Sequence, residues 1–163
     1  MHMKYHMRRA DKAIQDEDDL KKILRTTEYV TIALSKDDEP YLVSLSHGYD
    51  EEKNCIYFHC ASEGKKLDYM KVNDRTWGQA IQDHGYMQAE CNHAYATVQF
   101  SGRTKFLEDL EEKHRAMVVM IRQLDSDPEK MIKGLKPESL GSTVIGRIDI
   151  DYMTGKKTEE VTI

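Results

Sequence analysis

Apolar and polar residues alternate along much of this chain, and a period of two is the pattern of strands with one buried face. Segments that alternate in this way and are rich in β-branched or aromatic residues predict six strands, at Tyr29–Leu34, Tyr41–Leu45, Cys55–His59, Thr76–Ile81, Tyr95–Leu107 and Ser142–Tyr152. Short polar turns at 36–40 and 50–54 join the first three strands. We therefore expect an antiparallel meander, with Gly102 marking a bulge in the long fifth strand.

Other segments repeat apolar residues three and four positions apart, as helices do. Asp16 can cap a helix over Glu17–Thr26, and Ser62 can cap a short helix that Asn73 ends. A third helix is predicted over Glu111–Leu124, and Pro128 opens a brief fourth one. The inward-facing positions are Leu20, Ile23 and Leu24 in the first helix, Leu67, Met70 and Val72 in the second, and Ala116, Met117, Met120, Ile121 and Leu124 in the third.

The order of these segments shows no regular alternation of strand and helix, which is unlike a doubly wound parallel sheet. Five or six strands with helices at fixed places predict an α+β or mostly β architecture. The 163 residues fit one domain with one substantial core, and residues 1–15 form its N-terminal arm.

Charge and composition exclude several classes of partner. The formal net charge of -5 and the pI near 5.8 argue against a nucleic-acid binder, since such affinity comes largely from Lys and Arg. No apolar stretch has the length of a signal peptide or a membrane span, so we expect a cytoplasmic protein. Three cysteines at uneven spacing, Cys55, Cys60 and Cys91, fit reduced thiols in that compartment.

The most informative segment is 56–68, where the third strand ends in small and polar residues and runs into a helix. A helix start presents unpaired backbone N–H groups and a positive dipole end. Lys65 and Lys66 add two ammonium groups at that point, and together these groups can hold a phosphate monoester. The alternative interpretation is a solvated basic pair on an ordinary helix.

The third-strand motif and four other segments in the right order resemble nitroimidazole-resistance (Nim) proteins and the wider group of pyridoxamine-phosphate-oxidase-like FMN-binding split barrels. The third strand is similar to the family's Y-x-H-[SC]-A followed by E-G-[KR]-K. The other similar segments are Met7-Arg8-Arg9, Pro40 to Tyr49, Cys91 with Tyr95 to Arg103, and Met153-Thr154-Gly155-Lys156.

The resemblance implies a mostly β fold, namely a split β-barrel of six or so antiparallel strands with peripheral helices. It also implies a homodimer that holds FMN at the subunit interface. It implies that Lys65 and Lys66 bind the phosphate, that Tyr95 and Thr97 reach the cofactor of the other subunit, and that His59 lies beside the cofactor. The further cofactor contacts that it implies are the backbone of Val43, Ser44 and Leu45, and the strand end Phe58, His59, Cys60 and Ala61.

His59 is the candidate catalytic residue, because a histidine near neutral pKa can supply a proton during reduction of a small molecule. The alternative is a histidine that only packs and hydrogen-bonds. His59-Cys60 with Cys91 and His93 also offer zinc ligands, although the spacing matches no common zinc pattern, so we predict no metal site. A Cys91 thiol paired with His93 is a further open alternative.

The function expected from these features is an FMN-dependent reductase or oxidase of small molecules such as nitroaromatics. The C-terminal residues 154–163 lack the Arg-rich ending of the pyridoxamine phosphate oxidases, which makes that particular reaction less favoured. The competing function is a non-catalytic flavin- or haem-binding or sensing protein, since one fold hosts several functions.

Overall fold

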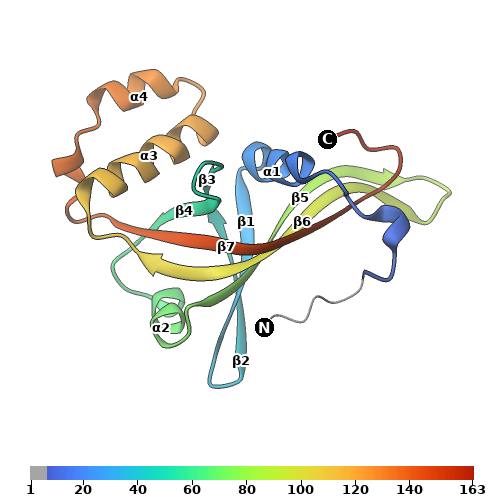
Figure 1. The fold of residues 1–163 in the computed structure, drawn as a ribbon, viewed down its shortest axis with the longest axis horizontal. Helices are drawn as coiled ribbons and strands as arrows, with labels where there is room; N and C mark the ends of the chain where they lie inside the picture. Colours follow the sequence, from blue (N-terminus) through green and yellow to red (C-terminus); the bar gives the residue numbers. More distant parts are fainter. Residues whose placement is uncertain (1–6) are drawn as a thin grey trace.

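The computed structural model describes residues 7–163, whose strands form one antiparallel sheet (Figure 1). The strand order across the sheet is β2-β1-β5-β6-β7-β4-β3. The strand bounds are β1 Tyr29–Lys36, β2 Glu39–Ser46, β3 Gly48–Asp50, β4 Cys55–Cys60, β5 Arg75–Met87, β6 Asn92–Phe106 and β7 Val144–Lys157. The predicted mostly β class with peripheral helices is confirmed, with seven strands.

The two edge strands of the sheet are consecutive in the chain, and only His47 separates the end of β2 from the start of β3. One residue cannot span a flat sheet, so the sheet must curl until its edges approach each other, which makes it a barrel. The predicted meander of the first three strands was therefore wrong: β4 pairs with β7, not with β2. Alternation within a strand identifies its buried face but not its neighbour.

His47 lies at this junction with its side chain fully buried. Its Nε2 is 2.9 Å from the carbonyl oxygen of Leu24, and Gln123 Nε2 donates to the carbonyls of Leu24 and Thr27. His47 Nδ1 is buried without a hydrogen-bond partner in the described part of the chain, and burial lowers the pKa of the ring. The barrel seam is thus closed around a neutral imidazole.

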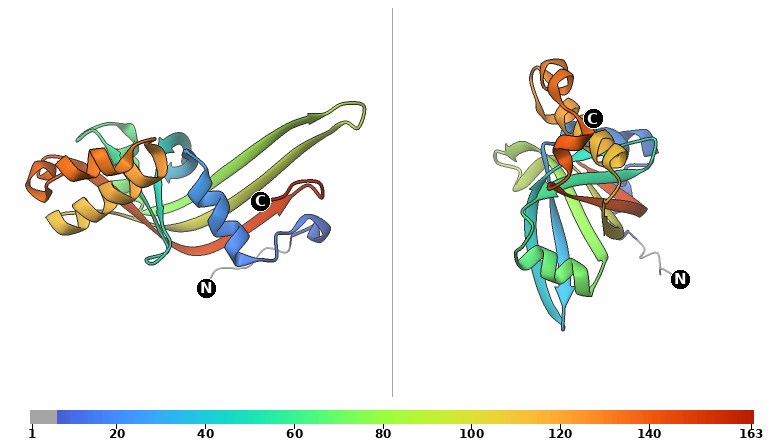
Figure 2. Two further views of the ribbon diagram at one scale, coloured as in Figure 1. Left: turned by 90° about the horizontal axis from the view of Figure 1, so that it is seen from above. Right: turned by 90° about the vertical axis from the view of Figure 1, so that its left-hand side faces the viewer.

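Within residues 7–163, four α-helices and two short 3₁₀ helices surround the sheet (Figures 1 and 2). The α-helices are α1 Glu17–Thr26, α2 Lys65–Val72, α3 Leu110–Leu124 and α4 Pro128–Gly134, and the 3₁₀ helices are Ala10–Lys12 and Pro137–Leu140. The predicted bounds of α1 are confirmed, as is its Asp16 cap, whose side chain accepts from the amide of Asp18. Pro128 opens α4, and Asn73 ends α2 as expected.

The main core fills the barrel, and α1 and α2 contribute side chains to it from different sides of the sheet (Figure 1). It contains Ile23 and Leu24 from α1, Tyr69 and Met70 from α2, and the inward residues of the strands, among them Ile32, Ile56, Phe58, Val98, Phe100 and Ile148. A second, smaller core lies under α3 and contains Cys55, Tyr57, Leu107, Ala116, Met120 and Ile145. Successive residues of β4 therefore face different cores.

Charged side chains fasten α3 to the rest of the chain. Asp109 caps its first turn by accepting from the amide of Glu112 at 2.8 Å. The buried Lys113 donates to the carbonyls of Leu140, Gly141 and Thr143. Arg115 holds the buried Asp50 with two hydrogen bonds, Nε to Oδ2 at 2.7 Å and Nη2 to Oδ1 at 3.0 Å.

Several local expectations differ from the structure. Leu124, at the end of α3, is 40% exposed and not inward. Ser62 does not cap α2, because the helix begins at Lys65 and Gly64 occupies the N-cap position. Val72, in the last turn of α2, is 61% exposed and not inward. β5 extends beyond Ile81 to Met87 because it pairs with β6 in a long hairpin arm, whose tip is exposed on both faces and so lacks apolar alternation.

The bulge predicted at Gly102 is confirmed, since the β6–β7 register shifts between Ser101 and Gly102. The first six residues of the predicted N-terminal arm lie outside the described residues. In the remainder of the arm, Ala13 bridges to Lys156 and Ile14 packs into the main core.

Candidate functional site

The link from β4 to α2 contains a backbone conformation that selects glycine. Gly64 precedes the first helical residue and has φ +135° and ψ 164°, a region that residues with a Cβ rarely adopt. The sequence Glu63-Gly64-Lys65 therefore allows the chain to leave the barrel wall and begin a helix at once.

The start of α2 lacks a side-chain cap. The amides of Leu67 and Asp68 donate to the carbonyl of Gly64, but the amides of Lys65 and Lys66 have no acceptor within residues 7–163. The starts of α1 and α3 instead carry the acceptors Asp16 and Asp109. Unpaired amides and the positive end of the helix dipole favour an anion, so the start of α2 is open to one from outside the chain.

The two lysines at this point have different surroundings. Lys65 Nζ lies 3.3 Å from Glu39 Oε1 and 4.8 Å from the ring centroid of Tyr41. Lys66 is half-buried and has no ion pair or hydrogen bond among residues 7–163. Lys66 thus offers an ammonium group that the described chain does not neutralise.

The strand residues before α2 point in alternate directions. Phe58 is fully buried in the main core, and its ring covers Gly146, where an added Cβ would lie 2.1 Å from the ring. Phe58 can therefore contact a ligand only through its backbone. β3 pairs with β4 only as far as Tyr57, so the backbone of the last three β4 residues has β7 on one side and no β3 on the other.

His59 and Cys60 lie on opposite faces of β4. His59 is exposed and has no hydrogen bond within the described residues, whereas Cys60 is half-buried and packs against the main core. Burial raises the pKa of the Cys60 thiol, and the nearby Lys66 ammonium opposes that rise. Ala61 follows and is exposed. His59 and Cys60 cannot both present side chains to one side of a bound ligand.

The predicted residues of β2 and β6 lie in one sheet, with β1 and β5 between the two strands. Val43 and Leu45 point into the main core, and Ser44 points outward, where its Oγ lies 2.9 Å from Thr31 Oγ1. Thr97 is also outward, one row away across the sheet. The outward row through Ser44 consists of Ser44, Thr31, Gln79, Gln99 and Thr154.

Thr97 carries a side-chain oxygen without a partner. Its Oγ1 is buried and makes no hydrogen bond in the described part of the chain. It borders a small cavity of about 60 Å³, whose lining also includes Met7, Gln99, Thr154, Gly155 and Lys156. A buried hydroxyl normally finds a partner, so an external polar group is expected to meet Thr97 here.

Tyr95 lies two residues earlier on the same outward face of β6. Its amide donates to Thr158 Oγ1 at 3.0 Å, and Lys12 Nζ lies 6.0 Å from its ring centroid. The start of β6 and α2 lie at different ends of the long axis of the molecule (Figure 1). Within one chain, Tyr95 and Thr97 are therefore not brought to the lysines.

An apolar patch adjoins the polar outward row. Register places Leu42, Ala33 and Trp77 side by side on three strands, and Leu42 is 67% exposed. Tyr29 and Ile81, on the other side of the polar row, are also exposed. A groove of about 360 Å³ is lined by Leu42, Ala33 and Trp77 of this patch and by Thr31, Gly78, Gln79 and Gln99. We call this surface of β2, β1, β5 and β6 the outward sheet face.

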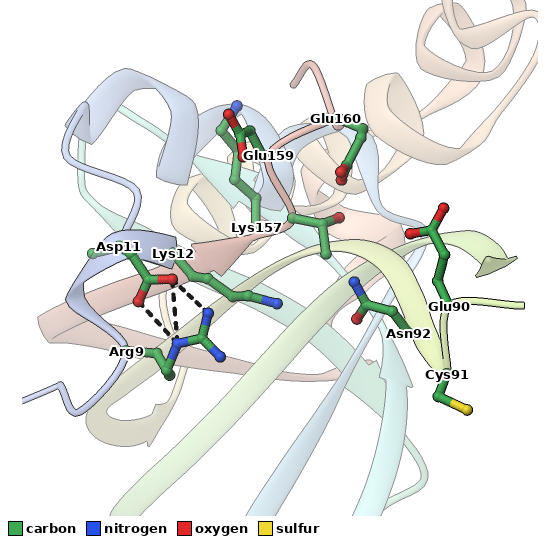
Figure 3. A pocket seen from close by; sticks show the side chains of 11 residues that line it. Arg9, Asp11, Lys12, Glu90, Cys91, Asn92, Lys157, Glu159 and Glu160 are labelled. Atoms are coloured by element: carbon green, nitrogen blue, oxygen red, sulfur yellow. Dashed lines mark hydrogen bonds and ion pairs between the residues drawn. The ribbon is translucent and has the colours of Figure 1, made fainter.

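A wide cleft of about 710 Å³ lies where the first 3₁₀ helix, the β5–β6 turn and the C-terminal segment meet (Figure 3). Charges of both signs line it: Arg9, Lys12, Lys157, Asp11, Glu90, Glu159 and Glu160. Arg9 is bound to Asp11, and Lys157 donates to the carbonyl of Val161, while Lys12 extends into the cleft (Figure 3). The sequence did not indicate this cleft because its walls come from three distant segments.

The two cysteine alternatives gain no support from the geometry. Cys91 lies in the β5–β6 turn, and His93 Nε2 is 2.7 Å from Asp83 Oδ1 instead of near the thiol. No cluster of three or more His, Cys, Asp or Glu side chains that could hold a metal ion occurs in residues 7–163. In the same residues, no helix has the length and apolar character required to span a bilayer.

Comparison with known proteins agrees with the fold. The model of the family described as pyridoxamine 5'-phosphate oxidase matches residues 16–157. A search of curated proteins found no match.

Three solved structures illustrate the structural likeness. A proposed 5-nitroimidazole antibiotic resistance protein from Bacteroides thetaiotaomicron is 20% identical, with a TM-score of 0.75 and 95% of each chain covered. An FAD-binding protein from Mesorhizobium loti is 23% identical, with a TM-score of 0.63 and coverage of 91% of this chain and 98% of that one. An FAD and haem binding protein from Mycobacterium smegmatis is 14% identical, with a TM-score of 0.74 and coverage of 93% and 76%. At these identities the likeness establishes the fold alone.

Proposed function

Because this chain belongs to the pyridoxamine 5'-phosphate oxidase family, we propose that it binds FMN, with the flavin's phosphate at the start of α2. The observation that carries the proposal is the uncapped helix start. The amides of Lys65 and Lys66 and the ammonium of Lys66 lack partners within residues 7–163, and all three belong to the first two residues after Gly64. A phosphate monoester supplies the charge and the acceptor oxygens that these donors need.

The chain's other unpartnered groups fit the rest of such a cofactor. The backbone at the end of β4 has a free edge, and Thr97 Oγ1 is a buried oxygen without a partner. A flavin ring carries both carbonyl acceptors and an N–H donor, so it can bond with groups of either kind. In this proposal Ser44 and the other residues of its row contribute contacts to the cofactor from the outward sheet face.

We further propose that the chain forms a homodimer through the outward sheet face. Exposed Leu42, Trp77 and Ile81 are large apolar side chains that water solvates poorly, and such patches typically mark interfaces. A twofold axis would pair the face with itself and bring Tyr95 and Thr97 of one chain toward the α2 start of the other. That arrangement would join residues that lie apart within one chain.

The proposed activity is reduction or oxidation of a small molecule, with nitroaromatics as the expected class. FMN, when bound, supplies the electron-transfer chemistry. The chain therefore has only to bind the cofactor, orient it and exclude water from it. Lys66 would hold the phosphate, and Gly64 would let the backbone approach it. His59, exposed and without a hydrogen bond within residues 7–163, would donate a proton from a ring nitrogen to the substrate.

A second candidate function is flavin or haem binding without turnover. The same free imidazole of His59 that could donate a proton could also ligate haem iron, since histidine is the commonest protein ligand of haem. A haem-loaded protein would show the intense Soret absorbance band, which FMN lacks.

An absorbance spectrum of the native protein, recorded with its mass in solution, tests these proposals together. Flavin absorbance at twice the monomer mass is expected, and bleaching by NADPH with reoxidation by a nitro compound would support the enzyme. A flavin spectrum without turnover would favour the binder, and a colourless monomer that takes up no added FMN would refute the proposed function.

Replacement of both Lys65 and Lys66 with Ala tests the location of the phosphate. The double variant is expected to lose FMN while its unfolding temperature changes little, since the lysines carry no core packing. Lys71→Ala, at the other end of α2, is the matched control. Full flavin occupancy in the double variant would remove the lysines from the site.

A further inference from the structure

The two neighbouring lysines of α2 differ in what already surrounds them. Lys65 lies over two aromatic rings, with Nζ 4.8 Å from the centroid of Tyr41 and 5.4 Å from that of Tyr69. The two rings are 5.2 Å apart and inclined at 54°. Glu39 Oε1 completes the surroundings at 3.3 Å from Nζ. The ammonium group of Lys65 therefore has a carboxylate and two ring faces inside the same chain.

These contacts join two separate elements. Glu39 and Tyr41 belong to the start of β2, whereas Lys65 and Tyr69 lie one turn apart on α2. The Lys65 ammonium lowers the pKa of Glu39, and the Glu39 carboxylate raises the pKa of Lys65. Lys65 thus ties the β1–β2 hairpin to the first turn of α2.

Lys66 has the opposite character. It is half-buried beside Cys60, and no carboxylate within residues 7–163 pairs with it. A phosphate that drew Lys65 away would have to break the pair with Glu39 and would face that carboxylate at close range. A phosphate at Lys66 displaces nothing from the described residues.

We propose that Lys66 is the phosphate ligand of the flavin site, and that Lys65 is a positioning residue which, together with Glu39 and the two tyrosines, fixes the first turn of α2. This inference rests on the proposed function. The sequence motif does not distinguish Lys65 from Lys66, whereas this inference gives the two lysines different roles. The orientation of the free amides at Lys65 and Lys66 then depends on the contacts of Lys65 with β2. The positive side-chain charge that binds the phosphate comes from Lys66 alone.

Exchange of the charges of Glu39 and Lys65 tests the division. The variant that combines Glu39→Lys with Lys65→Glu keeps the ion pair and the net charge, but puts a carboxylate where a phosphate ligand would be. FMN binding to the flavin-free full chain is measured by the loss of flavin fluorescence. A positioning role predicts an affinity within about threefold of wild type, and Lys65→Glu alone, which breaks the tie, is expected to weaken binding by about tenfold.

Lys66→Glu is expected to weaken FMN binding by about a hundredfold, and Glu39→Lys should not rescue it. Lys71→Glu controls for the charge of the helix. An exchange variant as weak as Lys66→Glu would overturn the inference while FMN binding by the wild type upholds the proposed function. A wild-type chain that does not bind FMN would overturn both.

A second pair of variants covers the case in which the exchange variant folds poorly. Lys65→Met and Lys66→Met keep the apolar stems and remove one charge each. Lys66→Met should lose about tenfold or more in FMN affinity, and Lys65→Met should lose less than about threefold. Equal losses in the two variants would overturn the inference.

Discussion

Helices α2 and α3 begin in opposite ways. α3 carries its own anion, because Asp109 caps the first turn, and the cations Lys113 and Arg115 are bound to carbonyls and to Asp50. α2 starts at Gly64 with no cap, and it places two lysines in the turn where positive charge is least favourable. The first turn of α3 has a side-chain cap, whereas in α2 the first two amides and the ammonium of Lys66 have no partner within residues 7–163.

The difference separates charges that hold the fold from charges available to a ligand. The charged residues of α3 are satisfied by partners up to 65 residues away in sequence, so their removal should cost stability and leave binding unchanged. The start of α2 is held in the core by Leu67, Tyr69 and Met70, so removal of its free ammonium should cost binding and leave stability unchanged. Four measurements can break or sharpen this contrast.

The largest effect is expected from Arg115→Met. The buried Asp50 would lose its guanidinium partner, and because Arg115 is partly exposed we expect a loss of about 3 kcal/mol in the free energy of unfolding. Urea unfolding at pH 7 measures it, and FMN affinity should not change.

The pH dependence of the same variant provides a control. Burial raises the pKa of Asp50, but the Arg115 guanidinium and Lys53, whose amide donates to Asp50, together outweigh burial, so the pKa lies below its ordinary value. A carboxyl with a depressed folded pKa stabilises the fold above its unfolded pKa and loses that contribution as the pH falls. The difference in the free energy of unfolding between wild type and variant should therefore shrink below about pH 4. A gap independent of pH would assign the loss to packing.

The next effect concerns ligand binding at α2. FMN at a hundred times its dissociation constant should stabilise the wild type by about 2.7 kcal/mol. At the same FMN concentration, Lys66→Ala should gain about 1 kcal/mol less, while Asp109→Ala should gain as much as wild type. Thermal unfolding with and without FMN measures both, and equal stabilisation of Lys66→Ala would contradict the contrast.

His47 provides an effect of similar size that depends on pH. It lies at the barrel seam, where Gln123 of α3 contacts it. Burial lowers the pKa of His47, so the unfolded chain takes up the proton first as the pH falls. Stability is then present above the unfolded pKa of about 6.5 and decreases below it, by up to about 1.4 kcal/mol between pH 7.5 and 5.5. His47→Gln should flatten this slope in urea unfolding, and an unchanged slope would point to other groups.

The smallest effect is expected from Asp109→Ala, which removes the cap of α3. Loss of an N-cap side chain costs about 1 kcal/mol, and Asp109→Asn should restore most of it because the amide oxygen still accepts. Chemical unfolding of the three proteins gives the comparison. A cost near zero would mean that the start of α3 is held by its tertiary contacts alone.

The sequence predicted the local features of this fold and of the site. The bounds and cap of α1, the bulge at Gly102 and the mostly β class follow from interactions within a few residues, which composition and periodicity record directly. The motif around Gly64 and the lysine doublet also identified the start of α2 as the candidate site. The exposed tip of the β5–β6 arm escaped prediction because it buries neither face.

Only the tertiary structure decided which distant residues meet. The pairing of β4 with β7, the closure of the barrel at His47 and the alignment of Leu42 with Trp77 depend on register summed over several strands, which no local pattern encodes. The same holds for the doublet: Lys65 and Lys66 are adjacent and chemically alike, and they differ because β2 brings Glu39 and Tyr41 to one of them. A side chain's identity fixes what it can bind, but its partners are fixed by the strands that fold against it.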